Sequence, residues 1–240
     1  MGSLLRILGI VLSTLVFSVL TVVALPIGIP ALTWVARNWS RVNLMVCGVR
    51  VVQEGWDPAL LERNSYVAMA NHISHFDVMA LYGYVPLPMR PIAKRELVYI
   101  PVFGWVLWAG AAIMIDRRNR KKASQSLRRA AQVIRDGSSV LMFPEGTRTP
   151  EGQMGALKKG AFHLALEAQV PVLPIGVEGT GAILPPHDWR IRPGTVHVRV
   201  GKPIETTGLQ NNDDGRRALM GQVEGALAEL SRQSKSATPA

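Results

Sequence analysis

The sequence of 240 residues contains a single cysteine, Cys47, and has far fewer acidic than basic side chains. One cysteine excludes an intramolecular disulfide framework and a zinc cluster held by several thiolates, which fits a reducing compartment. Aspartate and glutamate number 17 against 27 lysines and arginines, so the formal net charge is +10. We therefore expect anionic partners, such as acidic lipid headgroups, phosphorylated substrates or nucleic acid.

Several patterns that mark other classes of protein are missing. The chain has no Gly-x-Ser-x-Gly elbow, which argues against a serine hydrolase. It has no His-Glu-x-x-His motif, and His72 and His75 have no obvious third ligand nearby, so we expect no metal site. Aromatic residues make up only 6% and do not interleave with basic ones, so we expect no nucleic-acid partner.

A long apolar run lies near the N-terminus. Between Leu4 and Leu25 the only charged residue is Arg6. As a helix this run reaches about 33 Å, enough to cross a hydrocarbon core of about 30 Å. We predict a membrane segment here. A cleaved signal peptide fits less well, because its apolar region is usually only about 7 to 15 residues long.

A second segment, residues 31–46, follows two prolines, Pro26 and Pro30, and mixes apolar residues with Arg37 and Arg41. This mixture predicts an interfacial helix. If the first segment spans the bilayer, the arginines after it outweigh the one before it and place the rest of the chain in the cytoplasm. We thus expect a cell-membrane protein whose larger part is cytoplasmic. A hairpin of both segments in one leaflet is the alternative, and it weakens the inference about the side.

Beyond residue 47, short β-rich runs alternate with helical patterns, which predicts an α/β layer structure. Strands are expected at residues 49–52, 66–70, 113–115, 139–143, 172–175 and 196–200, and helices at 76–84, 122–135, 161–168 and 216–231. The expected organisation is a membrane anchor of one or two helices over 1–46, one folded domain over 47–232, and a flexible tail over 233–240 that frays.

Residues 71–77, Asn-His-Ile-Ser-His-Phe-Asp, directly follow a predicted strand. The carboxyl ends of strands in α/β sheets tend to carry functional sites. Ser74 and Asp77 fit a capping box that begins a helix, which leaves His72 in the incoming loop, able to fold back onto Asp77. A carboxylate that holds one imidazole nitrogen prepares the other to accept a proton, so the pair predicts a general base. A helix cap beside an ordinary loop histidine is the alternative.

A second polar segment, residues 143–149, follows the apolar run 139–142 in the same way. Gly146 permits a tight turn, and Arg148 carries a guanidinium suited to phosphate. A turn with a surface arginine is the alternative. Lys94 is a further candidate cation, and the basic stretch 117–135 fits either a solvated helix face or contact with anionic lipid.

Four blocks stand in order along the chain. They are residues 71–77 (Asn-His-x-x-x-x-Asp); Lys94, Glu96, Leu97, Pro101, Gly104, Gly110 and 115–117; residues 143–148 (Phe-Pro-Glu-Gly-Thr-Arg); and residues 170–175 (Val-Pro-Val-Leu-Pro-Ile). In sequence and spacing they resemble the blocks of the glycerolipid acyltransferase family of the PlsC type. The resemblance covers about residues 50 to 205.

The resemblance implies a mixed α/β sheet flanked by helices. It also implies transfer of an acyl chain to the sn-2 hydroxyl of lysophosphatidic acid, which gives phosphatidic acid for phospholipid biosynthesis. The donor would be acyl-CoA or acyl-carrier protein, with no further cofactor. By resemblance His72 is the general base and Asp77 orients it. The substrate-binding residues that it implies are Lys94, Arg117, Glu145, Gly146, Thr147 and Arg148, of which Arg148 would hold the acceptor phosphate.

An apolar tunnel is expected to set the length of the acyl chain, and residues 103–108 are candidates to line it. Two other functions are left open by the sequence. The acceptor could be another lysolipid, such as a lyso-ornithine lipid, because the same His and Asp chemistry would serve it. Alternatively, the chain could be a membrane-attached protein without activity that binds anionic lipid through its positive charge.

Overall fold

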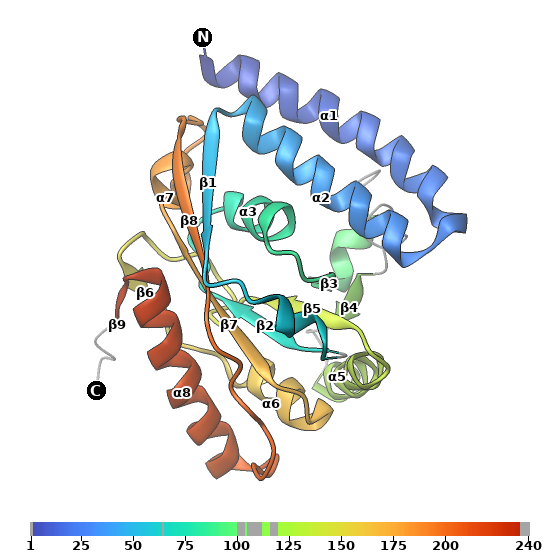
Figure 1. The fold of residues 1–240 in the computed structure, drawn as a ribbon, viewed down its shortest axis with the longest axis vertical. Coiled ribbons are helices and arrows are strands. Elements are labelled where there is room, and N and C mark those ends of the chain that lie inside the picture. The colour runs from blue at the N-terminus through green and yellow to red at the C-terminus, as the bar shows by residue number, and fades with distance from the viewer. Residues whose placement is uncertain (1, 64, 100–103, 105–111, 116–119, 236–240) are drawn as a thin grey trace.

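The computed structural model describes residues 2–63, 65–99, 104, 112–115 and 120–235 (Figure 1). Its helices are α1 (Gly2–Ala24), α2 (Ile29–Val46), α3 (Phe76–Tyr84), α5 (Arg120–Arg135), α6 (Lys159–Ala168), α7 (Thr180–Ile183) and α8 (Asp213–Ser231), with short helical turns η1 (Leu25–Ile27), η2 (Pro58–Leu61) and η3 (Arg95–Tyr99). Its strands are β1 (Val49–Glu54), β2 (Val67–Ala70), β3 (Met89–Lys94), β4 (Ile113–Ile115), β5 (Ser139–Met142), β6 (Gln153–Met154), β7 (Val172–Glu178), β8 (Gly194–Val200) and β9 (Ser234–Lys235).

Within the described residues, seven strands form one mixed sheet in the order β1-β8-β7-β2-β5-β3-β4. Neighbouring strands are parallel except β7 and β8, which are antiparallel. Because β2, β5, β3 and β4 all run the same way, their carboxyl ends meet at one edge of the sheet. This arrangement confirms the expected mixed α/β fold and places the loops after β2 and β5 side by side.

Helices cover both faces of the sheet (Figure 1). On one face α3 packs against the strands, and its Phe76 belongs to a buried apolar cluster. On the other face α5, α6 and α8 enclose a second cluster that includes Ile134 and Phe162. The four residues of β2 are buried and alternate between the two clusters. The central strand is thus apolar on both sides, as expected of a parallel strand with helices above and below it.

The helices α1 and α2 form an antiparallel hairpin that lies over α3 (Figure 1). Two hydrogen bonds join the hairpin's helices: Ser13 Oγ donates to Asn43 Oδ1 at 2.6 Å, and Trp39 Nε1 donates to Thr14 Oγ1 at 3.1 Å. Each bond lies between the two helices and satisfies a polar side chain there. The hairpin is therefore a packed unit.

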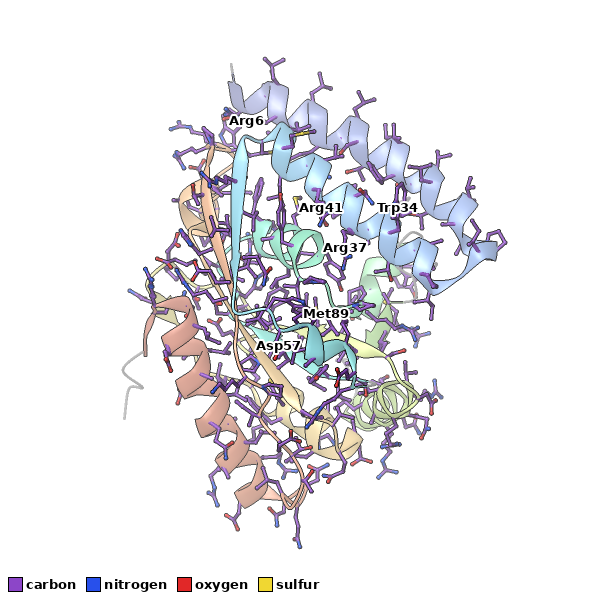
Figure 2. All side chains as sticks on the ribbon, in the orientation of Figure 1. Arg6, Trp34, Arg37, Arg41, Asp57 and Met89 are labelled. Atoms are coloured by element: carbon purple, nitrogen blue, oxygen red, sulfur yellow. The ribbon has the colours of Figure 1, made fainter. Side chains whose placement is uncertain are left out.

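Three arginines fasten the hairpin to the rest of the molecule. Arg37 and Arg41 lie between α2 and α3 (Figure 2) and donate to the carbonyls of Val85 and Gly83 at 3.3 and 2.8 Å. These carbonyls lie at the C-terminal end of α3, which favours positive charge. At the other end of the hairpin, Arg6 donates to the carbonyl of Ile191 at 2.9 Å.

Helix α1 turns its leucines outward and its hydroxyl groups inward. Leu4, Leu8 and Leu12 are 67%, 62% and 62% exposed. Thr14 and Thr21 donate to carbonyls one turn earlier at 2.7 and 2.8 Å, which satisfies their hydroxyls within the helix. This is the reverse of a helix on a water-facing surface. Among the described residues, Gly2–Ile27 is the one helical segment long and apolar enough to cross a membrane.

The predicted elements agree with the structure in most places. The strand at 113–115 and the helix at 76–84 are confirmed residue for residue, and the other predicted elements overlap observed ones. The sequence patterns missed β3, which contains Pro91. Its pairing with β5 ends at Pro91 and its pairing with β4 begins at Ile92, so the proline lies where the partner changes.

The expected C-terminal tail needs a correction at its start. Residues 233–240 were expected to fray, but Ser234 and Lys235 form β9 and pair in parallel with β6. Gln233 is also buried. A two-residue bridge carries no periodicity that a sequence pattern could reveal. Residues 236–240 lie outside the described part of the chain.

Candidate active site

Two loops meet at the carboxyl edge of β2 and β5. We call residues 71–75 the histidine loop and residues 143–155 the glutamate loop. Asn71, the first residue after β2, is fully buried and bridges to β7: its Nδ2 donates to the carbonyl of Val177 at 2.8 Å, and its Oδ1 accepts from the Val177 N–H at 2.7 Å. This amide continues the pairing of β2 and β7 one step beyond the strand and fixes where the histidine loop begins.

The structure brings His72 and Asp77 together, as the sequence predicted. His72 Nδ1 lies 2.8 Å from Asp77 Oδ2. The side chain of Asp77 is 0% exposed and that of His72 is 18% exposed. Phe143 of the glutamate loop stacks on the imidazole, with ring centroids 4.1 Å apart and planes 19° apart. The carboxylate and the aromatic ring together fix the orientation of the imidazole.

Asp77 has other hydrogen-bond partners besides His72. Its Oδ2 also accepts from the N–H groups of Ile73 and Ser74 at 2.7 and 2.9 Å. Its Oδ1 accepts from Thr180 Oγ1 at 2.5 Å. Both oxygens of this buried carboxylate thus have donors, which satisfies the group and fixes its orientation. No sequence pattern indicated Thr180, which lies 103 residues further along the chain than Asp77.

The predicted capping box at Ser74 forms only in part. Asp77 accepts from the Ser74 N–H, as the box requires. Ser74 Oγ, however, lies 3.3 Å from the N–H of Phe76 and donates to the carbonyl of Leu184 at 2.8 Å. The helix begins at Phe76, with His75 as the preceding residue. Ser74 therefore ties the histidine loop to the segment after α7, which a local pattern cannot reveal.

Glu145 joins the two loops from inside. It is 2% exposed. One carboxylate oxygen accepts from the N–H of His72 at 2.7 Å; the other accepts from the Gly155 N–H at 2.7 Å and from Thr149 Oγ1 at 2.9 Å. Burial raises the pKa of Glu145, and these three hydrogen bonds oppose that rise. All of its described hydrogen bonds are to the two loops, so Glu145 is placed to fix the position of one loop relative to the other.

Gly146, Thr147 and Arg148 lie on the outer side of the glutamate loop. Gly146 has φ +69°, a conformation that glycine adopts without strain, and a Cβ there would meet only the flexible end of the Lys158 side chain, so the backbone conformation is what favours glycine. Thr147 is exposed and Arg148 is half-buried. Burial lowers the pKa of His75, and the positive charge of Arg148 lowers it further. The Arg148 cation thus lies within electrostatic reach of the histidine loop.

Two predicted cations, Lys94 and Arg117, lie partly or wholly outside the described residues. Lys94 is the last residue of β3, whose carboxyl end lies at the same sheet edge as the two loops. Its side chain lies outside the described part, as do Arg117 and most of residues 103–108. Among the described residues, no three His, Cys, Asp or Glu side chains are grouped so that they could hold a metal ion.

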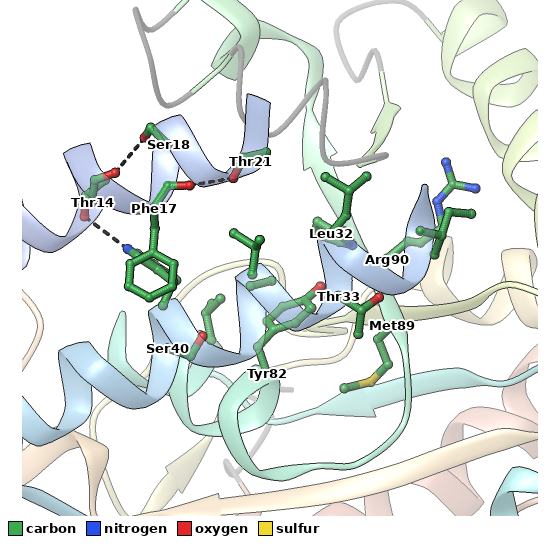
Figure 3. A pocket seen from close by; sticks show the side chains of 16 residues that line it. Thr14, Phe17, Ser18, Thr21, Leu32, Thr33, Ser40, Tyr82, Met89 and Arg90 are labelled. Atoms are coloured by element: carbon green, nitrogen blue, oxygen red, sulfur yellow. Dashed lines mark hydrogen bonds between the residues drawn. The ribbon is translucent and has the colours of Figure 1, made fainter. Parts of the chain in front are cut away.

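An apolar cavity of about 210 Å³ lies between the hairpin, α3 and β3 (Figure 3). Residues that line it include Thr14, Thr21, Ala36, Ser40, Val78 and Tyr82. Val78 directly follows Asp77, so the cavity borders the first turn of α3. The buried hydroxyls of Ser40 and Tyr82 have no hydrogen-bond partner within the described residues. Burial also raises the pKa of Tyr82. No sequence pattern indicated this cavity, because its walls come from four separate segments.

The fold and these loops define an α/β protein whose sheet edge presents a histidine that a buried carboxylate orients. Residues 50–178 match the family model named Acyltransferase. The chain belongs to this acyltransferase family, and the predicted resemblance is confirmed.

Relatives support the assignment over most of the chain. The 1-acyl-sn-glycerol-3-phosphate acyltransferase of Pseudomonas aeruginosa is 33% identical over 86% of this chain and 79% of its own length. The protein of the same name from Saccharomyces cerevisiae is 32% identical over 82% of this chain and 66% of its own length. The alpha form from Bos taurus is 37% identical over 62% of this chain, and the match covers 52% of the Bos taurus protein.

A solved structure shares the fold. It is the crystal structure of the 1-acyl-sn-glycerophosphate (LPA) acyltransferase, PlsC, from Thermotoga maritima. The TM-score is 0.69 at 24% sequence identity, and the match covers 95% of this chain and 99% of that one. The likeness therefore includes the N-terminal hairpin as well as the sheet.

Proposed function

We propose that this protein transfers a fatty acyl chain from a thioester to the sn-2 hydroxyl of lysophosphatidic acid, forming phosphatidic acid. The observation that carries the proposal is the 2.8 Å contact between His72 Nδ1 and the buried carboxylate of Asp77, at the strand end of a chain in the acyltransferase family. The relatives named as 1-acyl-sn-glycerol-3-phosphate acyltransferases support this acceptor. The donor is acyl-CoA or acyl-carrier protein, and no further cofactor takes part.

In this mechanism His72 acts through Nε2, because Nδ1 faces Asp77. Nε2 takes the proton of the acceptor hydroxyl, and the hydroxyl oxygen forms a bond to the thioester carbonyl carbon. The tetrahedral intermediate then collapses, the carbon–sulfur bond breaks, and the thiolate takes the proton back from the imidazolium. Asp77 holds the reactive tautomer and stabilises the imidazolium between these two steps. No covalent acyl-enzyme is required.

The acceptor phosphate is bound on the outer side of the glutamate loop. Arg148 offers a planar pair of N–H donors for phosphate, and its positive charge lowers the pKa of His75 in the histidine loop. Gly146 and Thr147 shape the turn that presents it, and Lys94, the last residue of β3, and Arg117 are further candidates to add positive charge. Glu145 serves this site by fixing the two loops to each other rather than by facing the anionic phosphate, to which its charge is unsuited.

The cavity beside α3 receives the acyl chain. It is apolar, Val78 in the first turn of α3 is one of its lining residues, and residues of the hairpin form much of its wall. A thioester carbonyl placed beside His72 would send its hydrocarbon tail along α3 into this space. The size of the cavity then sets which acyl lengths fit.

The hairpin holds the enzyme at the membrane with its outward leucines in one leaflet. Helix α1 is bonded to the body near its start through Arg6 and is packed on α2 along its length. A helix tied down in this way is better suited to lie along the bilayer surface than to cross it with the sheet on one side. The positive charge of the chain favours the anionic cytoplasmic leaflet.

The test is acyl transfer from a radiolabelled acyl-CoA to a panel of lysolipids by the detergent-solubilised full chain, repeated with acyl-carrier protein as donor. We expect label in phosphatidic acid, its loss by about 10,000-fold or more in His72→Ala, and little change in the matched loop variant His75→Ala. Faster labelling of a phosphate-free lysolipid, such as a lyso-ornithine lipid, would overturn the acceptor. Wild-type rates in folded His72→Ala would overturn the mechanism.

A further inference from the structure

One side chain outside the two loops reaches the carboxylate that orients His72. Thr180 is the first residue of α7 and is 0% exposed. Its hydroxyl donates to Oδ1 of Asp77, whereas the donors His72, Ile73 and Ser74 all meet Oδ2. Among the described residues, Thr180 is the one donor to Oδ1. A buried carboxylate oxygen that loses its donor favours protonation.

The position of Thr180 is fixed from the glutamate loop. The carboxylate of Glu151 accepts from the N–H groups of Gly179 and Ala182, the latter at 3.0 Å, so it holds the first turn of α7. A Cβ on Gly181 would lie 2.6 Å from Glu151 Oε2, so the small residue permits this close approach. The helix that carries Thr180 is therefore anchored to the segment that also carries the proposed phosphate-binding residues.

The far end of α7 is fixed from the histidine loop. Ser74 Oγ donates to the carbonyl of Leu184, which directly follows α7, at 2.8 Å. The adjacent N–H of Ser74 donates to Asp77. Both ends of the short helix are thus tied to the loops of the site, and its first side chain has little freedom to leave Asp77.

We propose that Thr180 is a positioning residue that acts on His72 through Asp77, a role that rests on the acyl transfer proposed above. Its hydroxyl holds the second carboxylate oxygen, which keeps Asp77 aligned with the imidazole. Without this bond the carboxylate is more basic and attracts the imidazolium more strongly. His72 then keeps its proton to a higher pH, and a smaller fraction of it can act as a base.

Three variants of the full-length chain in detergent test the proposal. Thr180→Val removes the hydroxyl and keeps the shape, Thr180→Ser keeps a hydroxyl, and Thr206→Val is the matched control. Thr206 is also buried, but it donates to the carbonyl of Val170, away from the two loops. We expect Thr180→Val to lower kcat about 10- to 100-fold with little change in KM, as loss of an orienting partner does elsewhere.

The acid limb of the pH–rate profile should move to higher pH in Thr180→Val. Thr180→Ser should restore both kcat and the profile, and Thr206→Val should leave both as in wild type. An unchanged kcat and profile in folded Thr180→Val would overturn the proposal. So would an equal loss in Thr206→Val, because that result would indicate general destabilisation.

A second readout needs no substrate and separates this proposal from the proposed function. Nitrogen-15 NMR of histidine-labelled protein follows the titration of His72, whose signals are assigned by their absence in His72→Ala. We expect a higher titration midpoint in Thr180→Val and the wild-type midpoint in Thr180→Ser and Thr206→Val. If wild type transfers no acyl chain, the proposed function fails, yet the midpoints still decide the role of Thr180. An unchanged midpoint in Thr180→Val overturns it.

Discussion

The two loops of the site and the cavity beneath the hairpin differ in whether their buried polar atoms are hydrogen-bonded. Around His72, both oxygens of Asp77 and of Glu145 accept hydrogen bonds. In the cavity, the hydroxyls of Ser40 and Tyr82 have no partner among the described residues. Directional bonds fix the first region in one geometry, whereas the second is defined by its shape. Substitutions should therefore stop catalysis in the first and change what fits in the second.

Among the residues that support His72, the largest effect is expected at Asp77. In Asp77→Asn the carboxylate that selects the His72 tautomer is lost, and the amide presents a donor where the imidazole and two backbone N–H groups need an acceptor. We expect kcat for acyl transfer to fall by about 1,000-fold or more. Asp188→Asn, at an acidic residue outside the two loops, is the control. Activity within tenfold of wild type, roughly the loss of one ordinary hydrogen bond, would contradict this account.

The next largest effect concerns stability and falls on Glu145. Glu145→Ala leaves the N–H groups of His72 and Gly155 without their acceptor, whereas the Thr149 hydroxyl can still donate to the carbonyl of Gln153 at 3.1 Å. We expect the free energy of unfolding to drop by about 3 kcal/mol, measured by urea denaturation in detergent. The exposed Glu62→Ala should change it by less than about 0.5 kcal/mol. A raised KM for the acceptor at unchanged stability would instead indicate direct substrate contact by Glu145.

A smaller effect is expected in the cavity. Ala36→Leu fills part of the space without touching the two loops. We expect kcat/KM to fall about tenfold for the longest acyl donors and to change little for short ones. The comparison is made by competition between donors of different length. Ala59→Leu, at an exposed position, is the control. An equal loss for every chain length would show that the cavity does not hold the acyl chain.

The smallest effect is the pH dependence of the Glu145 contribution. Because its pKa is raised from 4.5 by burial, the folded protein keeps this proton to a higher pH than the unfolded chain does. The contribution of Glu145 to stability should therefore decline as pH rises from 4.5 through the raised pKa and stay constant above it. The difference in unfolding free energy between wild type and Glu145→Gln measures this. A difference that grows with pH would mean that the three hydrogen bonds outweigh burial.

The sequence predicted the parts of the site that lie close together in the chain. His72 and Asp77 are five residues apart and follow an apolar strand, so their meeting could be argued from local spacing. The role of Glu145 could not be argued in this way, because its bond to the N–H of His72 depends on the pairing of β2 with β5. Thr180 was missed for the same reason, since it approaches Asp77 only after β7 has paired with β2.

Elements of the fold were predictable where proline and charged residues do not interrupt the hydrophobic pattern, and β3 was missed because they do interrupt it. The helix at 76–84 and the strand at 113–115 have bounds that the pattern already indicated. Strand β3 contains Pro91 and charged residues, which disguise a strand that is shared between two partners. The cavity had no sequence signal, because apolar residues at helical spacing occur equally in a filled core.

The bond between Arg6 and the carbonyl of Ile191 spans 185 residues of chain, and this has a consequence for biosynthesis. Ribosomes add about 5 to 20 residues per second, so Arg6 is made roughly 10 to 40 s before its partner exists. During that interval α1 has no folded body to rest on, and its leucines need another apolar surface. Under the membrane attachment proposed above, the hairpin reaches the bilayer first, and the rest of the enzyme folds onto a segment already in place.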